Sequence, residues 1–208
     1  MAAVKWFLKL DRRIIYVIVA LAIIIPLLWP MGLPIHTTPP VEAVYKDIDK
    51  LPAGSRVWIA FDYDPSSQPE LQPMALALLK HCFSKKLRVI TMTLWPGGPN
   101  LIVQALDEMK KEFGVVDGTD FVNMGYKPGG YLVIIGAGQN IKDTFTTDMF
   151  GKSTGPMPIL SDIKSMKDID YCVEIGAGNS IDWWIAYGHQ QYGYPLAIGC
   201  TAVSATQY

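Results

Sequence analysis

A Gly-Ala-Gly unit that occurs twice places the strongest constraint on the fold of this chain. Residues 131–145 read YLVIIGAGQNIKDTF, and residues 171–185, forty positions later, read YCVEIGAGNSIDWWI. Each copy has an apolar run typical of a buried strand, a glycine turn and the polar start of a helix. Strands that alternate with helices form a parallel sheet with crossover helices. The repeat therefore predicts an α/β fold.

Further apolar runs extend the predicted sheet, and they lie at residues 56–61, 87–94, 121–124 and 196–201. We expect a three-layer α/β sandwich with a mostly parallel, flavodoxin- or Rossmann-like sheet over residues 56–208. The chain ends shortly after the last predicted strand, where a further helix is expected, so either the domain is truncated at its C-terminus or the sheet ends in an unpaired tail. The architecture resembles flavodoxin-like and amidotransferase-like domains in the extracytoplasmic parts of some ABC-transporter auxiliary proteins.

The N-terminal region is typical of a membrane anchor. Residues 1–13 contain four basic residues and one acid, whereas residues 14–35 contain no charge. Such a stretch spans about 33 Å as a helix, enough for a bilayer core. The positive-inside rule predicts a cytoplasmic N-terminus, a transmembrane anchor at 14–35 and an extracytoplasmic domain, joined by a linker with a short amphipathic stretch at 36–55. A cleaved signal peptide is the alternative, but Trp29–Pro34 offers no small-residue cleavage site.

Composition excludes several classes of function. The net charge of −1 gives no electrostatic case for nucleic acid. The three cysteines and three histidines are scattered, with no spacing typical of a metal site. We therefore expect no metal and no cofactor.

Candidate reactive groups follow the first predicted strand. Asp62 and Asp64 form an Asp-x-Asp pair after an apolar run. This pair resembles the nucleophile motif of haloacid-dehalogenase-like phosphatases, which implies that Asp62 attacks phosphorus and Asp64 acts as acid and base. Pro65 and the lack of a later acidic pair depart from that family. The alternative is a proline-containing turn with solvated carboxylates.

Cys200 lies where the last predicted strand meets a turn. The sequence Gly199-Cys200-Thr201-Ala202 is similar to the nucleophile elbow of class I glutamine-amidotransferase-like hydrolases. That resemblance implies a Cys-His-Glu set, with His189 and Glu174 as the partners. A small, inert, buried cysteine is the alternative interpretation.

The glycine turns are candidate ligand sites. Gly136, Gly138, Gly176, Gly178 and Asn179 can cradle a phosphate at a helix N-terminus. The dinucleotide fingerprint requires a third glycine, and isoleucine stands at that position in both copies. Glycine that only permits a tight turn is the alternative.

Three aromatic residues near the second copy suggest a contact surface. Trp183 and Trp184 are adjacent, so both cannot face the core of one helix, and Tyr187 follows one turn later. Together with the anchor, this surface predicts a non-enzymatic subunit of a larger membrane complex. Its expected partners are the bilayer, through residues 14–35, and other membrane proteins. A homo-oligomer is compatible with the same features. The alternative is an extracytoplasmic ligand-binding domain or hydrolase that uses Asp62, Asp64 and Cys200.

Overall fold

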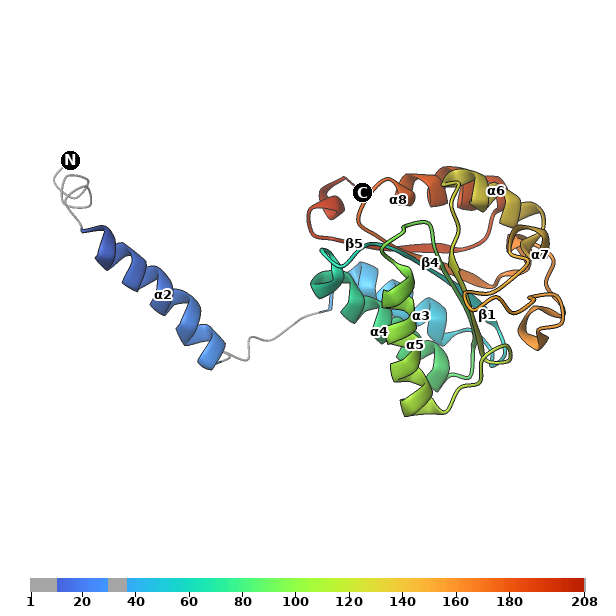
Figure 1. Cartoon of the computed structure of the whole chain (residues 1–208), viewed down its shortest axis with the longest axis horizontal. Helices are drawn as coiled ribbons and strands as arrows, with labels where there is room; N and C mark the ends of the chain where they lie inside the picture. The colour runs from blue at the N-terminus through green and yellow to red at the C-terminus, as the bar shows by residue number, and fades with distance from the viewer. Residues whose placement is uncertain (1–10, 30–36, 208) are drawn as a thin grey trace. The chain divides into compact units, whose positions relative to one another are not determined.

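The structure, a computed structural model, describes residues 11–29 and 37–207. The chain divides into two compact units, residues 1–39 and 40–208 (Figure 1). The first unit contains helix α2, Arg12–Leu28. Asp11 caps its N-terminus, because the Asp11 side chain accepts a hydrogen bond from the Arg13 backbone N–H.

The membrane-anchor prediction falls mainly on α2. This helix has 17 residues and none of them is buried. Within residues 11–29 and 37–207, no helix combines the length and the apolarity needed to cross a bilayer. The described helices therefore do not support the transmembrane part of the prediction, and positions 30–35 of the predicted anchor lie outside the described residues.

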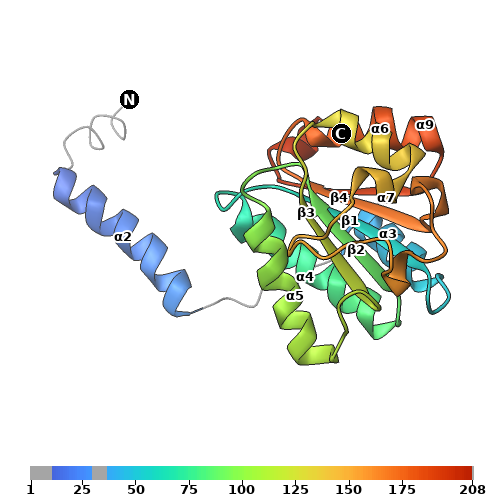
Figure 2. The ribbon, with the colours of Figure 1, turned by 45° about the vertical axis from the view of Figure 1, so that its right-hand side comes forward.

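The second unit is built on a five-stranded, all-parallel sheet with the order β3-β2-β1-β4-β5 (Figure 2). The strands are β1 Arg56–Asp62, β2 Arg88–Thr93, β3 Phe121–Tyr126, β4 Tyr171–Gly176 and β5 Leu196–Cys200. This sheet confirms the predicted α/β class. The order reverses between β1 and β4, which is the position where open α/β sheets commonly bind ligands.

Helices cover both faces of the sheet. One face packs against α3 Pro39–Asp49, α4 Gln68–Ser84 and α5 Pro99–Phe113. The other packs against α6 Tyr131–Gln139, α7 Ile141–Thr144, and a helical run made of α8 Ser180–Trp183, the π-helical η3 Trp184–His189 and α9 Gln190–Tyr192. The 3₁₀ turns are η1 Pro158–Leu160, η2 Met166–Asp168 and η4 Ser204–Thr206.

The continuous apolar run of strand β1 contributes side chains to the hydrophobic cores on both faces of the sheet. Successive side chains of a strand point to opposite faces. Ile59 and Phe61 belong to the core under α4 and α5, whereas Trp58 and Ala60 belong to the core under α6. By the same alternation, Asp62 lies on the face covered by α6 and α8.

The first Gly-Ala-Gly copy is not a strand. Residues 131–139 form helix α6, with Val133, Ile134 and Ala137 buried. The predicted strand and glycine turn at Gly136 and Gly138 are therefore wrong. A short apolar run suits a buried helix as well as a strand, and β3 already occupies the preceding position in the sheet.

The second copy folds as predicted. Tyr171–Gly176 forms β4, and a helical run from Ser180 to Tyr192 follows it. The chain between α7 and β4 is largely irregular and contains the 3₁₀ turns η1 and η2.

Candidate functional site

Two acidic side chains lie together inside the domain, at the carboxyl ends of β1 and β4. Asp62 is the last residue of β1 and Glu174 lies on the neighbouring β4, where it pairs with Ala60. The register places both side chains on the face covered by α8 and η3. Both residues are 0% exposed. Buried acids are uncommon unless they have hydrogen-bond partners, so their surroundings decide their charge.

Two donors from different parts of the chain hold Asp62. The backbone N–H of Leu94, the residue directly after β2, donates to Oδ1 at 2.6 Å. The Trp184 indole N–H donates to Oδ2 at 2.9 Å, from the first residue of η3. The Asp62 carboxyl group therefore connects β1, β2 and the helical run after β4.

Glu174 has a different set of partners. The Ser180 hydroxyl donates to Glu174 Oε1 at 2.8 Å, whereas Oε2 is buried without a protein donor. The Glu174 carboxyl group also lies close enough to Asp62 for the Asp62 charge to raise its pKa.

Burial sets the charge of both groups. Desolvation raises the pKa of Asp62 to about 6, although the hydrogen bonds from Leu94 and Trp184 favour its ionised form. Desolvation and the neighbouring Asp62 charge raise the pKa of Glu174 well above its usual value. Both carboxyl groups therefore hold their protons to higher pH than exposed acids do.

The predicted phosphatase pair does not face a common exposed site. Asp64 is partly exposed and accepts hydrogen bonds from the hydroxyl and the backbone N–H of Ser66, which lower its pKa. Asp62 points into the core, where a substrate cannot reach it in this conformation. The geometry matches the alternative interpretation, a capped turn, at Asp64.

Cys200 is not joined to its two predicted partners. His189 donates through Nδ1 to the Tyr194 carbonyl oxygen at 2.7 Å, and Glu174 accepts a hydrogen bond from the Ser180 hydroxyl. Partial burial, followed by the nearby Glu70 charge, raises the pKa of the Cys200 thiol. A catalytic cysteine requires the opposite shift.

The glycines of the second copy permit close packing. A methyl group at Gly176 would lie 2.5 Å from Glu174 Oε1, and one at Gly178 would lie 2.9 Å from the Trp95 ring. Asn179 makes no side-chain cap. In the first copy, methyl groups at Gly136 and Gly138 would meet Thr144 and Tyr192. Packing therefore explains these glycines, and their predicted use in ligand binding stays a prediction.

The predicted aromatic surface is present in part. Trp184 is buried and bonds Asp62, so it does not belong to the surface. Tyr187 is 37% exposed, and its ring stacks on that of Tyr131 from α6, with 4.6 Å between centroids. The Trp183 ring meets Tyr131 edge-on at 6.4 Å. With exposed Leu132, these residues form what we call the aromatic surface.

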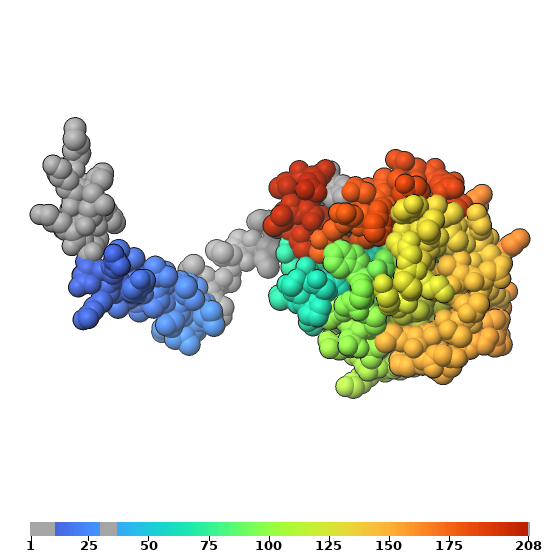
Figure 3. Space-filling view, turned by 45° about the horizontal axis from the view of Figure 1, so that its top comes forward, coloured from blue at the N-terminus to red at the C-terminus, as the bar shows by residue number. Residues whose placement is uncertain are grey.

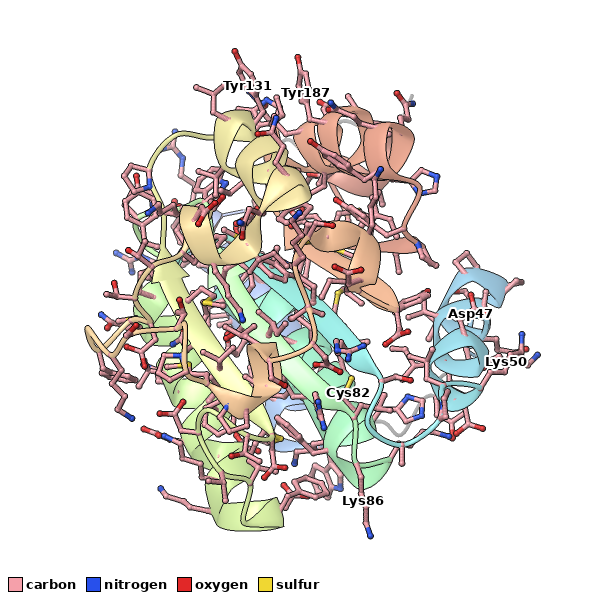
Figure 4. All side chains as sticks on the ribbon, turned by 90° about the vertical axis from the view of Figure 1, so that its right-hand side faces the viewer. Asp47, Lys50, Cys82, Lys86, Tyr131 and Tyr187 are labelled. Atoms are coloured by element: carbon pink, nitrogen blue, oxygen red, sulfur yellow. The ribbon has the colours of Figure 1, made fainter. Side chains whose placement is uncertain are left out.

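Figure 3 shows α6 and the helical run after β4 adjacent to each other on the outside of the domain. Tyr131 and Tyr187 point away from the sheet in Figure 4. Sequence reasoning missed Tyr131 because it assigned that residue to a strand.

A polar pocket lies at the carboxyl end of β3. It has a volume of about 280 Å³, and its lining includes Lys127, Thr147 and Asp148. Asp148 is 6% exposed, and its Oδ1 accepts from the backbone N–H groups of Phe150 and Lys152, both at 2.8 Å. Its Oδ2 is buried without a hydrogen-bond partner among the described residues. The sequence analysis did not single out this acid, which lies in the irregular segment between α7 and η1.

Among residues 11–29 and 37–207, no three His, Cys, Asp or Glu side chains are grouped to hold a metal ion. No protein-family model matches the chain, and comparison with curated proteins and with solved structures likewise gives no match.

Proposed function

We propose that this chain is a non-enzymatic, membrane-anchored subunit of a larger membrane protein complex. In this proposal residues 14–35 hold the chain at the cell membrane, with residues 1–13 in the cytoplasm and the α/β domain outside. The uncharged stretch and its basic flank support this orientation. The domain then serves assembly or sensing beside the bilayer.

The aromatic surface is the observation that carries the proposal. Tyrosine and tryptophan are enriched in protein interfaces, because they bury much apolar area and retain a polar group. Tyr131 and Tyr187 keep 40% and 37% of their surface exposed although they stack on each other. The stack fixes both rings before any partner binds, which lowers the entropy cost of binding.

Mild-detergent extraction of the native protein, followed by sizing and mass spectrometry of co-migrating proteins, tests the proposal. We expect a defined larger assembly that a Tyr131→Ala/Tyr187→Ala double variant loses. Phe150→Ala is the matched control, since this ring is exposed elsewhere. An unchanged set of neighbours in the double variant would count against the aromatic surface. Release of the protein from membranes by alkaline carbonate would count against the anchor.

Small-ligand binding is the second candidate function, and the polar pocket at the end of β3 favours it. Its lining brings Asp148 together with Lys127 and Thr147, whose ammonium and hydroxyl groups can hydrogen-bond a small polar ligand. Native mass spectrometry of the full-length protein, freshly purified, tests this function. A retained small molecule that Asp148→Ala abolishes and Asp64→Ala preserves supports it, and equal spectra for all three proteins contradict it.

A further inference from the structure

Strand β5 leaves one side of its backbone unpaired. It forms an edge of the sheet and pairs in parallel with β4, from Leu196 opposite Cys172 to Cys200 opposite Gly176. Within residues 37–207, the backbone of 196–200 makes hydrogen bonds to β4 alone. An edge of this kind is a template for another strand.

The opposite edge of the sheet is covered. The Gly118 N–H donates to the Phe121 carbonyl oxygen at 2.7 Å, and the Met149 N–H donates to that of Asn123 at 2.8 Å. Loop segments thus occupy the outer side of β3. The two edges differ, and β5 is the one that is open to pairing.

The sequence around β5 has little protection against pairing. Natural edge strands are commonly protected by charges, proline or bulges. Residues 190–208 contain no Asp, Glu, Lys or Arg, and β5 itself reads LAIGC, without proline. Ile198, Gly199 and Cys200 are partly exposed. Two such strands can approach each other without repulsion between like charges.

An apolar groove borders this edge. It lies between α3 and α4, has a volume of about 460 Å³, and includes Ala197, Ile198 and Gly199 of β5 in its lining. Val41, Tyr45 and Met74, on its helical walls, are exposed by 57%, 58% and 38%. The unpaired edge and the groove form one continuous surface of low polarity.

We propose that β5 is a self-association site, at which β5 of a second copy of this chain adds in antiparallel orientation. Antiparallel pairing of identical strands closes by a two-fold rotation, so each donor meets an acceptor in the other copy. The rotation axis passes through the sheet near Ile198, the middle residue of β5. It keeps both grooves on the same face, where they meet across the junction. This inference does not depend on the proposed membrane function.

Disulfide trapping tests the geometry in the full-length protein. In a Cys200→Ser background, cysteine replaces Leu196, Ile198 or Gly199 one at a time; Cys82 and Cys172 are buried. Facing residues in antiparallel strands have Cα atoms about 4.5–5.5 Å apart, which a disulfide can span. The axis near Ile198 places this residue opposite its own copy, so we expect efficient oxidative dimerisation for Ile198→Cys. Leu196→Cys and Gly199→Cys, which face other residues of the second copy, and Val203→Cys, an exposed control beyond the strand, should link poorly. No link for Ile198→Cys, or equal links at all sites, would overturn the proposal.

Light scattering in mild detergent tests the affinity. We expect the wild type to dimerise, and Ile198→Lys to weaken the dimer at least about tenfold, equal to about 1.4 kcal/mol. Val203→Lys adds the same charge outside the strand and keeps the dimer. Circular dichroism confirms that each variant is folded. A monomeric wild type, or a dimer that Ile198→Lys leaves intact, would place any self-association elsewhere and overturn the inference.

Discussion

The Asp62 and Glu174 carboxyl groups lie together in the interior of the domain, with neither residue exposed, and the charge of Asp62 raises the pKa of Glu174. They come from adjacent strands, and Ser180 and Trp184 cover them from the helical run after β4. Because burial disfavours both charges, the pair binds protons more tightly in the folded chain than in the unfolded chain. Folding stability must then depend on pH through this pair.

The sign of this dependence follows from the raised pKa values. Stability from Asp62 is fully present below its unfolded pKa of 3.8 and is lost as pH rises through about 6. Glu174 adds a loss in the same direction at higher pH. We expect Glu174→Gln, which keeps an acceptor for the Ser180 hydroxyl and carries no charge, to be more stable than wild type at pH 8 by about 1–3 kcal/mol, and similar at pH 5. Urea unfolding of the full-length protein measures the difference.

Asp64→Asn is the control for that experiment, because its partly exposed carboxylate has a lowered pKa. Any stability from Asp64 is present above its unfolded pKa and is lost as pH falls through its folded pKa. This variant should therefore not gain stability at pH 8. A Glu174→Gln protein with the pH profile of wild type would contradict the raised pKa of Glu174.

Trp184→Phe removes the indole donor from the buried Asp62 carboxylate. Leaving a buried charged acceptor unsatisfied costs about 1–3 kcal/mol, so we expect a loss of that size at pH 8. The loss should shrink below pH 6, where Asp62 is protonated and needs the donor less. Trp183→Phe is the matched control, since Trp183 is only partly buried. Urea unfolding at both pH values measures the effect; a loss equal at both would indicate packing alone.

The order of strands and helices could largely be predicted, because β1, β2, β4 and β5 are apolar runs bounded by turn residues. The run Leu132–Ile135 has the same appearance, yet it belongs to a helix. Only the tertiary position, beside β3 and over the sheet, distinguishes these cases.

The role of Asp62 could not be read from its position at a strand tip. Its side chain follows Trp58 and Ala60 onto the face covered by α6 and α8, and one residue of register would have turned it to the face covered by α4 and α5. Glu174, an acid within an apolar strand, was the available signal that a buried partner existed. The Trp183 and Trp184 pair did behave as expected, since Trp184 is buried and Trp183 is not.

Cys200 should react slowly with alkylating agents. Its raised pKa leaves less thiolate than an ordinary cysteine has at pH 8, and the thiolate is the reactive form. We expect iodoacetamide to modify Cys200 more slowly than glutathione, and to leave Cys82 unmodified until urea unfolds the chain, since burial raises the pKa of Cys82 to about 12. Mass spectrometry of timed samples measures this. If iodoacetamide modifies Cys200 faster than it modifies glutathione, the result would support the interpretation of Cys200 as a nucleophile.

Gly138→Ala distinguishes a packing role from a ligand role for the first Gly-Ala-Gly copy. Alanine in a helix is ordinarily better than glycine by about 1 kcal/mol. Here the new methyl group would lie 2.1 Å from the Tyr192 ring, whose hydroxyl donates to the Ile135 carbonyl oxygen. We therefore expect a loss of about 1–3 kcal/mol in the free energy of unfolding, and a gain once Tyr192→Ala removes the ring. Gly155→Ala, whose methyl group meets nothing closer than 3.7 Å, should be nearly neutral. A loss that persists without the Tyr192 ring would show that another contact requires glycine at position 138.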